Sequence, residues 1–145
     1  SGIDASRLIL EITESMLLGN LDETIAKMRC LRDAGIRFSI DDFGTGYSSL
    51  ARLKRLPIDR LKIDRTFIRD LPFDEDDTAI ARAVIALGNS LGLRVIAEGV
   101  ESVEQAEFLK QEGCHEAQGY YYSKPVSAGI ATEILANKTQ LCRTS

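Results

Sequence analysis

The chain has 145 residues, of which 28% are charged and 44% hydrophobic, the balance of an ordinary soluble globular domain. This length allows one domain, but it falls short of the roughly 200 residues that a complete (β/α)8 barrel needs. The formal net charge of −4 excludes a chain that binds nucleic-acid polymers by charge. No apolar run approaches the roughly 20 residues that would form a membrane segment. Three cysteines, an odd number, indicate free thiols in a reducing cytoplasm.

Apolar runs of strand length alternate with segments of helical periodicity. The predicted strands are Leu8–Ile12, Ile36–Ile40, Leu61–Ile63, Arg94–Ala97 and a short one near Ala117. The predicted helices begin at or just after Asn20, Ser48, Asp74, Ser102 and Ser127, and three of them end at Gly35, Gly92 and Gly113. Ser1-Gly2 is set aside as a possible cloning scar, and residues 138–145 are expected to be a frayed tail. Because no hairpin signal separates the units, the pattern predicts an α/β fold with parallel strands.

Each predicted strand runs into an acid or an amide at its C-terminal end. These residues are Glu11, Asp41 with Asp42, Asp64, Glu98 and Gln118, and Glu14 and Glu101 follow three residues after Glu11 and Glu98. In parallel α/β folds the C-terminal strand ends share one rim, where active sites form. The residues are therefore expected to converge. The alternative is that acids before a helix act as caps or dipole partners, and for Glu101 both interpretations stay open.

Several converging carboxylates would repel one another unless cations neutralise them. Since no Cys or His is among them, the cations are expected to be Mg²⁺ or Mn²⁺. The adjacent Asp41 and Asp42 could help to bind two metals, a geometry that suits displacement at phosphorus. Lys62 would then hold the attacking water or a phosphoryl oxygen, or it forms a simple ion pair with Asp64 or Glu98.

Residues 43–49 place two glycines among small hydroxyl residues, directly after the aspartate pair. They form either a mobile loop that closes over a ligand or a plain turn into the next helix. His115 is interpreted as structural or exposed. The run Tyr120-Tyr121-Tyr122 offers a ring that could stack on a base, although packing is the commoner fate of strand aromatics.

Five motifs resemble the EAL-domain family of bacterial cyclic di-GMP phosphodiesterases, which have a TIM-barrel-like fold. The motifs are Glu11-Ile12-Thr13-Glu14-Ser15, Asp41-Asp42-Phe43-Gly44-Thr45-Gly46-Tyr47-Ser48-Ser49-Leu50, Leu61-Lys62-Ile63-Asp64, Ala97-Glu98-Gly99-Val100-Glu101 and Gln118-Gly119-Tyr120. The resemblance extends from about Leu8 to Ala136. It implies hydrolysis of cyclic di-GMP to linear pGpG with two Mg²⁺ or Mn²⁺ ions.

The same resemblance implies individual roles. Glu11 and Asp41 would bind one metal, and Asp41, Asp42 and Glu98 the second. Lys62 would contact the nucleophilic water, with Glu98 as a candidate general base. In supporting roles, Glu14 would brace the loop around Thr45, Gln118 would lie near the water or substrate, and Asp64 and Glu101 would support the site.

The family's Glu-x-Leu motif and the strand that carries a metal-binding Asn are absent from this sequence. The expectation is therefore a single truncated domain over 1–145, the C-terminal part of a longer EAL domain, with about five of eight βα units and an incomplete two-metal site. Such a chain would have little or no phosphodiesterase activity alone. The alternative function is a catalytically silent EAL-like domain that binds cyclic di-GMP or a protein partner. Two exposed barrel edges and an apolar inner face predict self-association. The expected compartment is the cytoplasm, although the full-length protein could be membrane-anchored.

Overall fold

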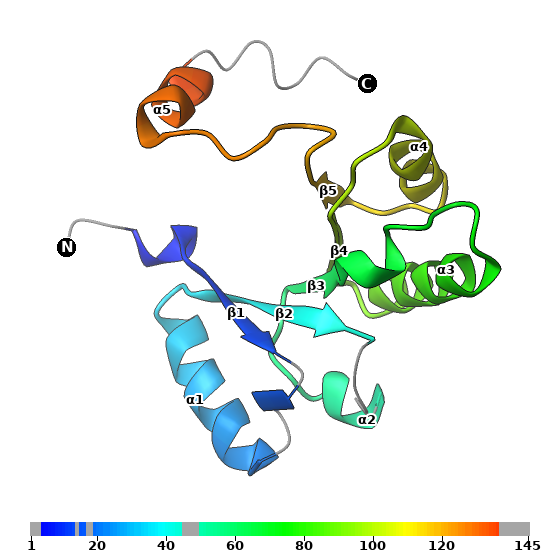
Figure 1. The fold of residues 1–145 in the computed structure, drawn as a ribbon. Coiled ribbons are helices and arrows are strands. Elements are labelled where there is room, and N and C mark those ends of the chain that lie inside the picture. Colours follow the sequence, from blue (N-terminus) through cyan, green and yellow to red (C-terminus); the bar gives the residue numbers. More distant parts are fainter. Residues whose placement is uncertain (1–3, 14, 17–18, 45–49, 137–145) are drawn as a thin grey trace.

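A five-stranded parallel sheet forms the centre of the computed structural model, which describes residues 4–13, 15–16, 19–44 and 50–136 (Figure 1). The strands are β1 (Ile9–Thr13), β2 (Arg37–Phe43), β3 (Arg60–Ile63), β4 (Arg94–Glu98) and β5 (Glu116–Gln118), in the order β1-β2-β3-β4-β5. All four strand pairs are parallel. This confirms the expected α/β class and the run of five βα units of a TIM-like barrel.

Helices follow the strands in turn. They are α1 (Leu21–Asp33), α2 (Leu50–Leu53), α3 (Glu75–Ser90), α4 (Val103–Gln111) and α5 (Ala128–Ala136), with short 3-10 turns η1 (Ala5–Arg7) and η3 (Arg65–Phe67). Three of the predicted caps are confirmed: Asn20 accepts from the Glu23 N–H, Asp74 accepts from the Asp77 N–H, and Ser102 forms a capping box with Gln105. The proposed scar, the first residues of the Ser48 helix and the tail from 138 lie outside the described residues.

The hydrophobic core lies between the sheet and the helices that cover its outer face. Its largest fully buried members include Ile40, Leu61, Ile63, Ile85 and Leu109. Gly88 allows α3 to pack closely on β4, since a Cβ there would lie 2.2 Å from Val95 Cγ2. This packing is what holds the strand ends, and the side chains they carry, in a fixed arrangement.

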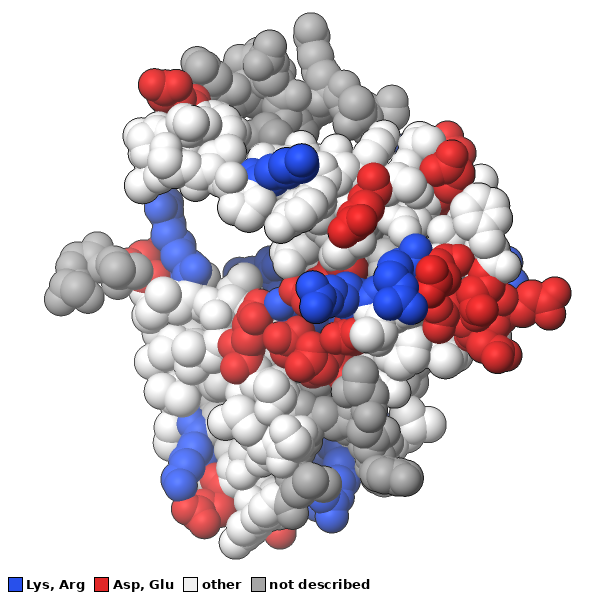
Figure 2. All heavy atoms as spheres, in the orientation of Figure 1, with Lys and Arg blue, Asp and Glu red and all other residues white. Residues whose placement is uncertain are grey.

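The inner face of the sheet is polar, which corrects the expectation of an apolar one. A hollow of about 300 Å³ on this face is lined by Ile9, Glu11, Ser39, Arg60, Lys62, Ile96, Glu116, Ala117 and Gln118. The charged side chains of this hollow form ion pairs across the strands, Arg60 with Glu116 and Lys62 with Glu11, so none of these four charges lies here without an opposite charge. Figure 2 shows acidic and basic side chains interleaved in a band across the molecule, which continues on the right into a large acidic group. Glu75, Asp76 and Asp77 lie in the first turn of α3.

Part of the exposed apolar surface lies near the ends of the described chain. In and beside β1, one edge of the sheet, Leu8, Ile9 and Leu10 are 42%, 38% and 42% exposed. None of the residues of α5 is buried. Tyr120, Tyr121 and Tyr122 are also exposed, and the last two contact each other edge to face, so the packing expected of them is not observed. None of the described helices is both long and apolar enough to cross a membrane.

Candidate active site

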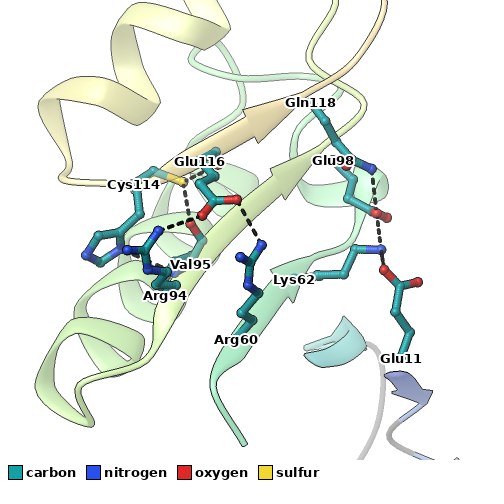
Figure 3. A network of polar contacts seen from close by, with 10 residues as sticks. Glu11, Arg60, Lys62, Arg94, Val95, Glu98, Cys114, Glu116 and Gln118 are labelled. Atoms are coloured by element: carbon teal, nitrogen blue, oxygen red, sulfur yellow. Dashed lines mark hydrogen bonds and ion pairs between the residues drawn. The ribbon is translucent and has the colours of Figure 1, made fainter. Parts of the chain in front are cut away.

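Lys62 is the centre of the polar cluster at the rim of the sheet. Its side chain is only 7% exposed, and its Nζ lies 2.7 Å from Glu11 Oε1 of β1 and 3.6 Å from Asp41 Oδ1 of β2. It also forms an ion pair with Glu98 of β4. Figure 3 shows Glu11, Lys62, Glu98 and Gln118 lying one after another across the strands. Side chains from the ends of all five strands thus converge as the sequence predicts, and the ion pair proposed for Lys62 is observed with Glu98.

The register of the sheet explains how Glu98 and Gln118 meet. The two residues are direct partners on β4 and β5, and Gln118 Nε2 donates to Glu98 Oε1 over 2.8 Å. Lys62 is paired with Ile96, two residues before Glu98 on the same face of β4. Its long side chain therefore reaches along the strand direction to the Glu98 carboxylate, which two neighbouring strands hold in place.

A bulge places both Asp41 and Asp42 near the cluster. Ile40 pairs with Leu61 and Phe43 with Ile63, so β2 has an extra residue here relative to β3. Asp42 takes a φ of 54°, a left-handed conformation that Asp tolerates better than most residues. In a regular strand adjacent side chains point to opposite faces, so the bulge is what directs both acids to one place.

Burial, hydrogen bonds and neighbouring charges shift the pKa values of three side chains at this rim. Burial would lower the pKa of Lys62, but its hydrogen bonds to Glu11 and Glu98 outweigh burial and raise that pKa. Burial, contact with Asp64 and the negative charges of Asp41 and Glu98 raise the pKa of Asp42. Burial would raise the pKa of Asp64 too, but hydrogen bonds from the Thr66 hydroxyl and N–H lower it. The rim therefore carries more negative charge than Lys62 neutralises.

The donor chemistry of the rim fits a hard divalent cation. All the candidate ligands are carboxylates, and burial together with the neighbouring carboxylates Asp64, Asp41 and Glu98 raises the pKa of Asp42. The arrangement is less suited: within the described ranges, no three Asp, Glu, His or Cys side chains are placed so that they could hold a metal ion. The Lys62 ammonium lies among Glu11, Asp41 and Glu98, so in this structure a protein cation pairs with these carboxylates.

The supporting residues divide into those near the cluster and those away from it. Asp64 caps η3 and contacts Asp42. Glu101 is exposed and lines a different hollow with Asp70 and Phe73, while its backbone N–H donates to Gln105. Glu14 and Thr45 lie outside the described residues. His115 is structural, as expected, since its Nδ1 accepts from the Val95 N–H.

Sequence reasoning missed a second charged layer beneath the first. Arg60 and Arg94 both bind Glu116, at 3.0 and 3.1 Å. The period of two in strands could have found it, because Arg60 lies two residues before Lys62 and Glu116 two before Gln118.

Comparison with known proteins gives the family. The model of the EAL domain matches residues 1–125. The cyclic di-GMP phosphodiesterase NbdA of Pseudomonas aeruginosa is 49% identical over 135 residues, which are 93% of this chain and 17% of that protein. The chain thus spans about a sixth of the length of this curated relative.

Solved structures agree with the sequence matches. The phosphodiesterase MucR of Pseudomonas aeruginosa, in complex with cyclic di-GMP, has a TM-score of 0.84 and 48% identity, covering 89% of this chain and 52% of that one. The EAL domain of Mycobacterium smegmatis DcpA has a TM-score of 0.87 and 43% identity, covering 94% and 61%. The BlrP1 protein of Klebsiella pneumoniae, 35% identical with a TM-score of 0.78 over 86% and 32% of the two chains, was solved with manganese and cyclic di-GMP. By family model, sequence and fold, this chain belongs to the EAL-domain family.

Proposed function

We propose that this chain carries the metal- and water-handling part of a cyclic di-GMP phosphodiesterase site, which opens one phosphodiester bond to give linear pGpG. The observation that carries the proposal is the contact of Lys62 with Glu11 and Glu98 at the rim of the sheet. The relatives named cyclic di-GMP phosphodiesterase and the complex of MucR with cyclic di-GMP support this substrate.

The proposal gives each rim residue a chemical role. Glu11, Asp41, Asp42 and Glu98 would hold divalent cations, Mg²⁺ or Mn²⁺, which polarise a phosphoryl oxygen and acidify a bound water. Lys62 would donate from Nζ to the attacking water or to a phosphoryl oxygen. Glu98 would take the proton of that water, while Gln118 fixes the orientation of its carboxylate.

The other predicted residues act on the surroundings of the site. We propose that Glu14 and Thr45 control the loop that follows Asp42, and that Asp64 limits the movement of Asp42 through their contact. Glu101 would support the site only indirectly, since it lies on the side of Asp70 and Phe73. A substitution of Glu101 should accordingly affect ligand binding less than one of Glu98.

On its own, this chain is proposed to bind cyclic di-GMP with little or no turnover. The supporting observation is that Lys62 occupies the space among Glu11, Asp41 and Glu98. The described acids would need Lys62 to move before they could share a cation. The second candidate function, a binding domain without catalysis, is favoured for the isolated chain by the same observation.

Calorimetry with cyclic di-GMP in the presence of Mn²⁺ or Mg²⁺ tests the proposal. We expect metal-dependent binding that Glu98→Gln abolishes and that Glu112→Gln, a change in an ion pair between α3 and the residue that caps the end of α4, leaves intact. If the chain bound neither the metal nor cyclic di-GMP, the proposed site would be refuted. Chromatography of the products tests turnover separately, and rapid formation of pGpG by this chain would refute the expected inactivity.

We also propose that copies of the chain associate through the β1 edge, and that they do so in the cytoplasm. Exposed Leu8, Ile9 and Leu10 beside unpaired strand backbone favour pairing with a second edge. The free thiols of Cys30 and Cys114 support a reducing compartment. Light scattering of Ile9→Lys tests the association. The molar mass of the variant in solution should be smaller than that of the unchanged chain. Equal molar masses of the two proteins at high concentration would contradict the association.

A further inference from the structure

A second layer of charge lies directly beneath the Lys62 cluster on the inner face. Glu116 Oε2 accepts from Arg60 Nη1 over 3.0 Å, and Glu116 Oε1 accepts from Arg94 Nη1 over 3.1 Å. Figure 3 shows Glu116 between the two guanidinium groups. Arg60 and Arg94 are direct partners on β3 and β4, so their like charges would repel without the carboxylate. One side chain of β5 is thereby tied to two other strands.

This tie matters because β5 is short and lies at an edge. The strand has three residues and, within the described part of the chain, pairs only with β4, through Glu116, Ala117 and Gln118. The side chain of Arg60 is only 19% exposed, so its contact with Glu116 is better shielded from water than an ordinary surface pair. The link from Glu116 to β3 crosses β4 and fixes the position of β5 along its neighbours.

The position of β5 determines where Gln118 lies. Gln118 is two residues after Glu116 on the same face, and its Nε2 donates to Glu98 Oε1. The Glu98 carboxylate also pairs with Lys62. A shift of β5 by even a fraction of a residue would break the contact between Gln118 and Glu98 while leaving the hydrophobic core in place, because the core lies on the other face.

We propose that Glu116 is a positioning residue for the rim: by binding Arg60 and Arg94 it fixes β5, and through Gln118 it orients the Glu98 carboxylate toward Lys62. Its meaning for catalysis rests on the function proposed above, but the positional link does not. Glu116 touches neither substrate nor metal in this scheme. It acts through Gln118.

NMR of the uniformly ¹⁵N-labelled chain, without metal or nucleotide, tests the link. The side-chain Nε2 protons of Gln118 report the hydrogen bond to Glu98, and the backbone amides of α3 report the stability of the core. In Glu116→Gln we expect the hydrogen-bonded Gln118 proton to lose most of its downfield shift while hydrogen-exchange protection in α3 is unchanged. The matched control is Glu112→Gln, which removes a carboxylate that pairs with Arg82 over 2.8 Å and should change neither signal.

A second variant covers the case in which Glu116→Gln does not fold. Arg94→Gln removes one of the two arms at a side chain that is 65% exposed, and it should shift the Gln118 signal partway. An unchanged Gln118 signal in a folded variant would overturn the proposal. A loss of hydrogen-exchange protection in α3 as large as the loss in β5 would also overturn the proposal, since Glu116 would then stabilise the whole fold. Failure of the chain to bind cyclic di-GMP would instead refute the proposed function and leave this result standing.

Discussion

Lys62 Nζ on β3 lies 2.7 Å from Glu11 Oε1 on β1, although β2 separates the two strands. The contact spans the inner face and brings together residues 51 positions apart in the sequence. It also gives the nearly buried ammonium a partner on the side away from Glu98. The cation at the centre of the rim is thus part of the fold before any metal or substrate is considered.

Replacing Lys62 by Met should therefore destabilise the metal-free protein. Glu11, Asp41 and Glu98 would lose their shared cation, which we expect to cost about 1–2 kcal/mol because the carboxylates are partly hydrated. Urea unfolding in a chelating buffer measures this. Adding Mn²⁺ should reduce the difference in free energy of unfolding between Lys62→Met and the unchanged chain, because a bound metal ion would replace the lost positive charge.

Lys27→Met is the control for Lys62→Met. Lys27 pairs with Glu23 at the surface, with side chains 72% and 60% exposed, so its loss should change the free energy of unfolding by less than about 0.5 kcal/mol. A Lys62→Met protein as stable as the control, with or without Mn²⁺, would contradict the role of Lys62 as the cation of the rim.

Asp42 and Asp64 are in contact at the rim, and replacing each by Asn should change the free energy of unfolding in opposite directions. Because the pKa of Asp42 is raised, its ionised form is disfavoured in the folded state, and Asp42→Asn should raise the free energy of unfolding at neutral pH by less than about 1 kcal/mol. The gain should fade as the pH falls through the pKa of Asp42, since the protonated acid is neutral too.

Asp64→Asn is expected to act in the opposite sense. The pKa of Asp64 is lowered, so its ionised form contributes stability that is present above the ordinary pKa of Asp and is lost as the pH falls. The variant should be less stable at neutral pH by about 0.5–1 kcal/mol. Urea titrations of both variants between acidic and neutral pH measure the pair, and changes of the same sign would contradict this electrostatic account.

The convergence of the acids could be predicted because it depends only on topology. Alternating strands and helices imply parallel strands, and parallel strands place Glu11, Asp41, Glu98 and Gln118 at one rim whatever the details of packing. The caps at Asn20, Asp74 and Ser102 were likewise predictable, since a cap depends on residues within one turn of the helix.

Features that depend on the reach of side chains could not be predicted. The bulge at Asp41 and Asp42 arises from pairing with β3, and no local signal marks it. The pairing of Arg60 with Glu116 could not be predicted because the two residues lie two strands apart and over fifty residues apart in sequence, although the period of two in strands places both on the inner face.

The turn after β5 should not tolerate a side chain at Gly119. A Cβ there would lie 2.1 Å from Val100 O and 2.3 Å from Val100 N, so Gly119→Ala must displace the backbone next to Gln118. We expect a loss of about 2–4 kcal/mol in the free energy of unfolding, together with loss of the hydrogen bond from Gln118 to Glu98.

Gly129→Ala is the matched control for this turn. Gly129 lies in α5 and a Cβ there meets no heavy atom within 4 Å, so the same substitution should be neutral or slightly stabilising. Thermal unfolding followed by circular dichroism compares the two. Equal effects of the two substitutions would contradict the close approach of Gly119 to Val100.

Cys114 predicts a pH dependence of stability in the alkaline range. Burial raises the pKa of this thiol from 9.0 to about 11, with opposing hydrogen bonds from the backbone near Glu116. The unfolded chain therefore ionises first, and the contribution of Cys114 to stability is complete below pH 9 and lost as the pH rises toward 11. Two pKa units correspond to about 2.7 kcal/mol. Urea unfolding at pH 8 and pH 11 should show this loss in the unchanged chain, and Cys114→Ala should lose less stability over the same range because the contribution of the thiol is gone. Cys30 is exposed and supplies the control, so Cys30→Ala should retain the full pH dependence of the free energy of unfolding. A dependence that decreases in both variants, or in neither, would refute the assignment to Cys114.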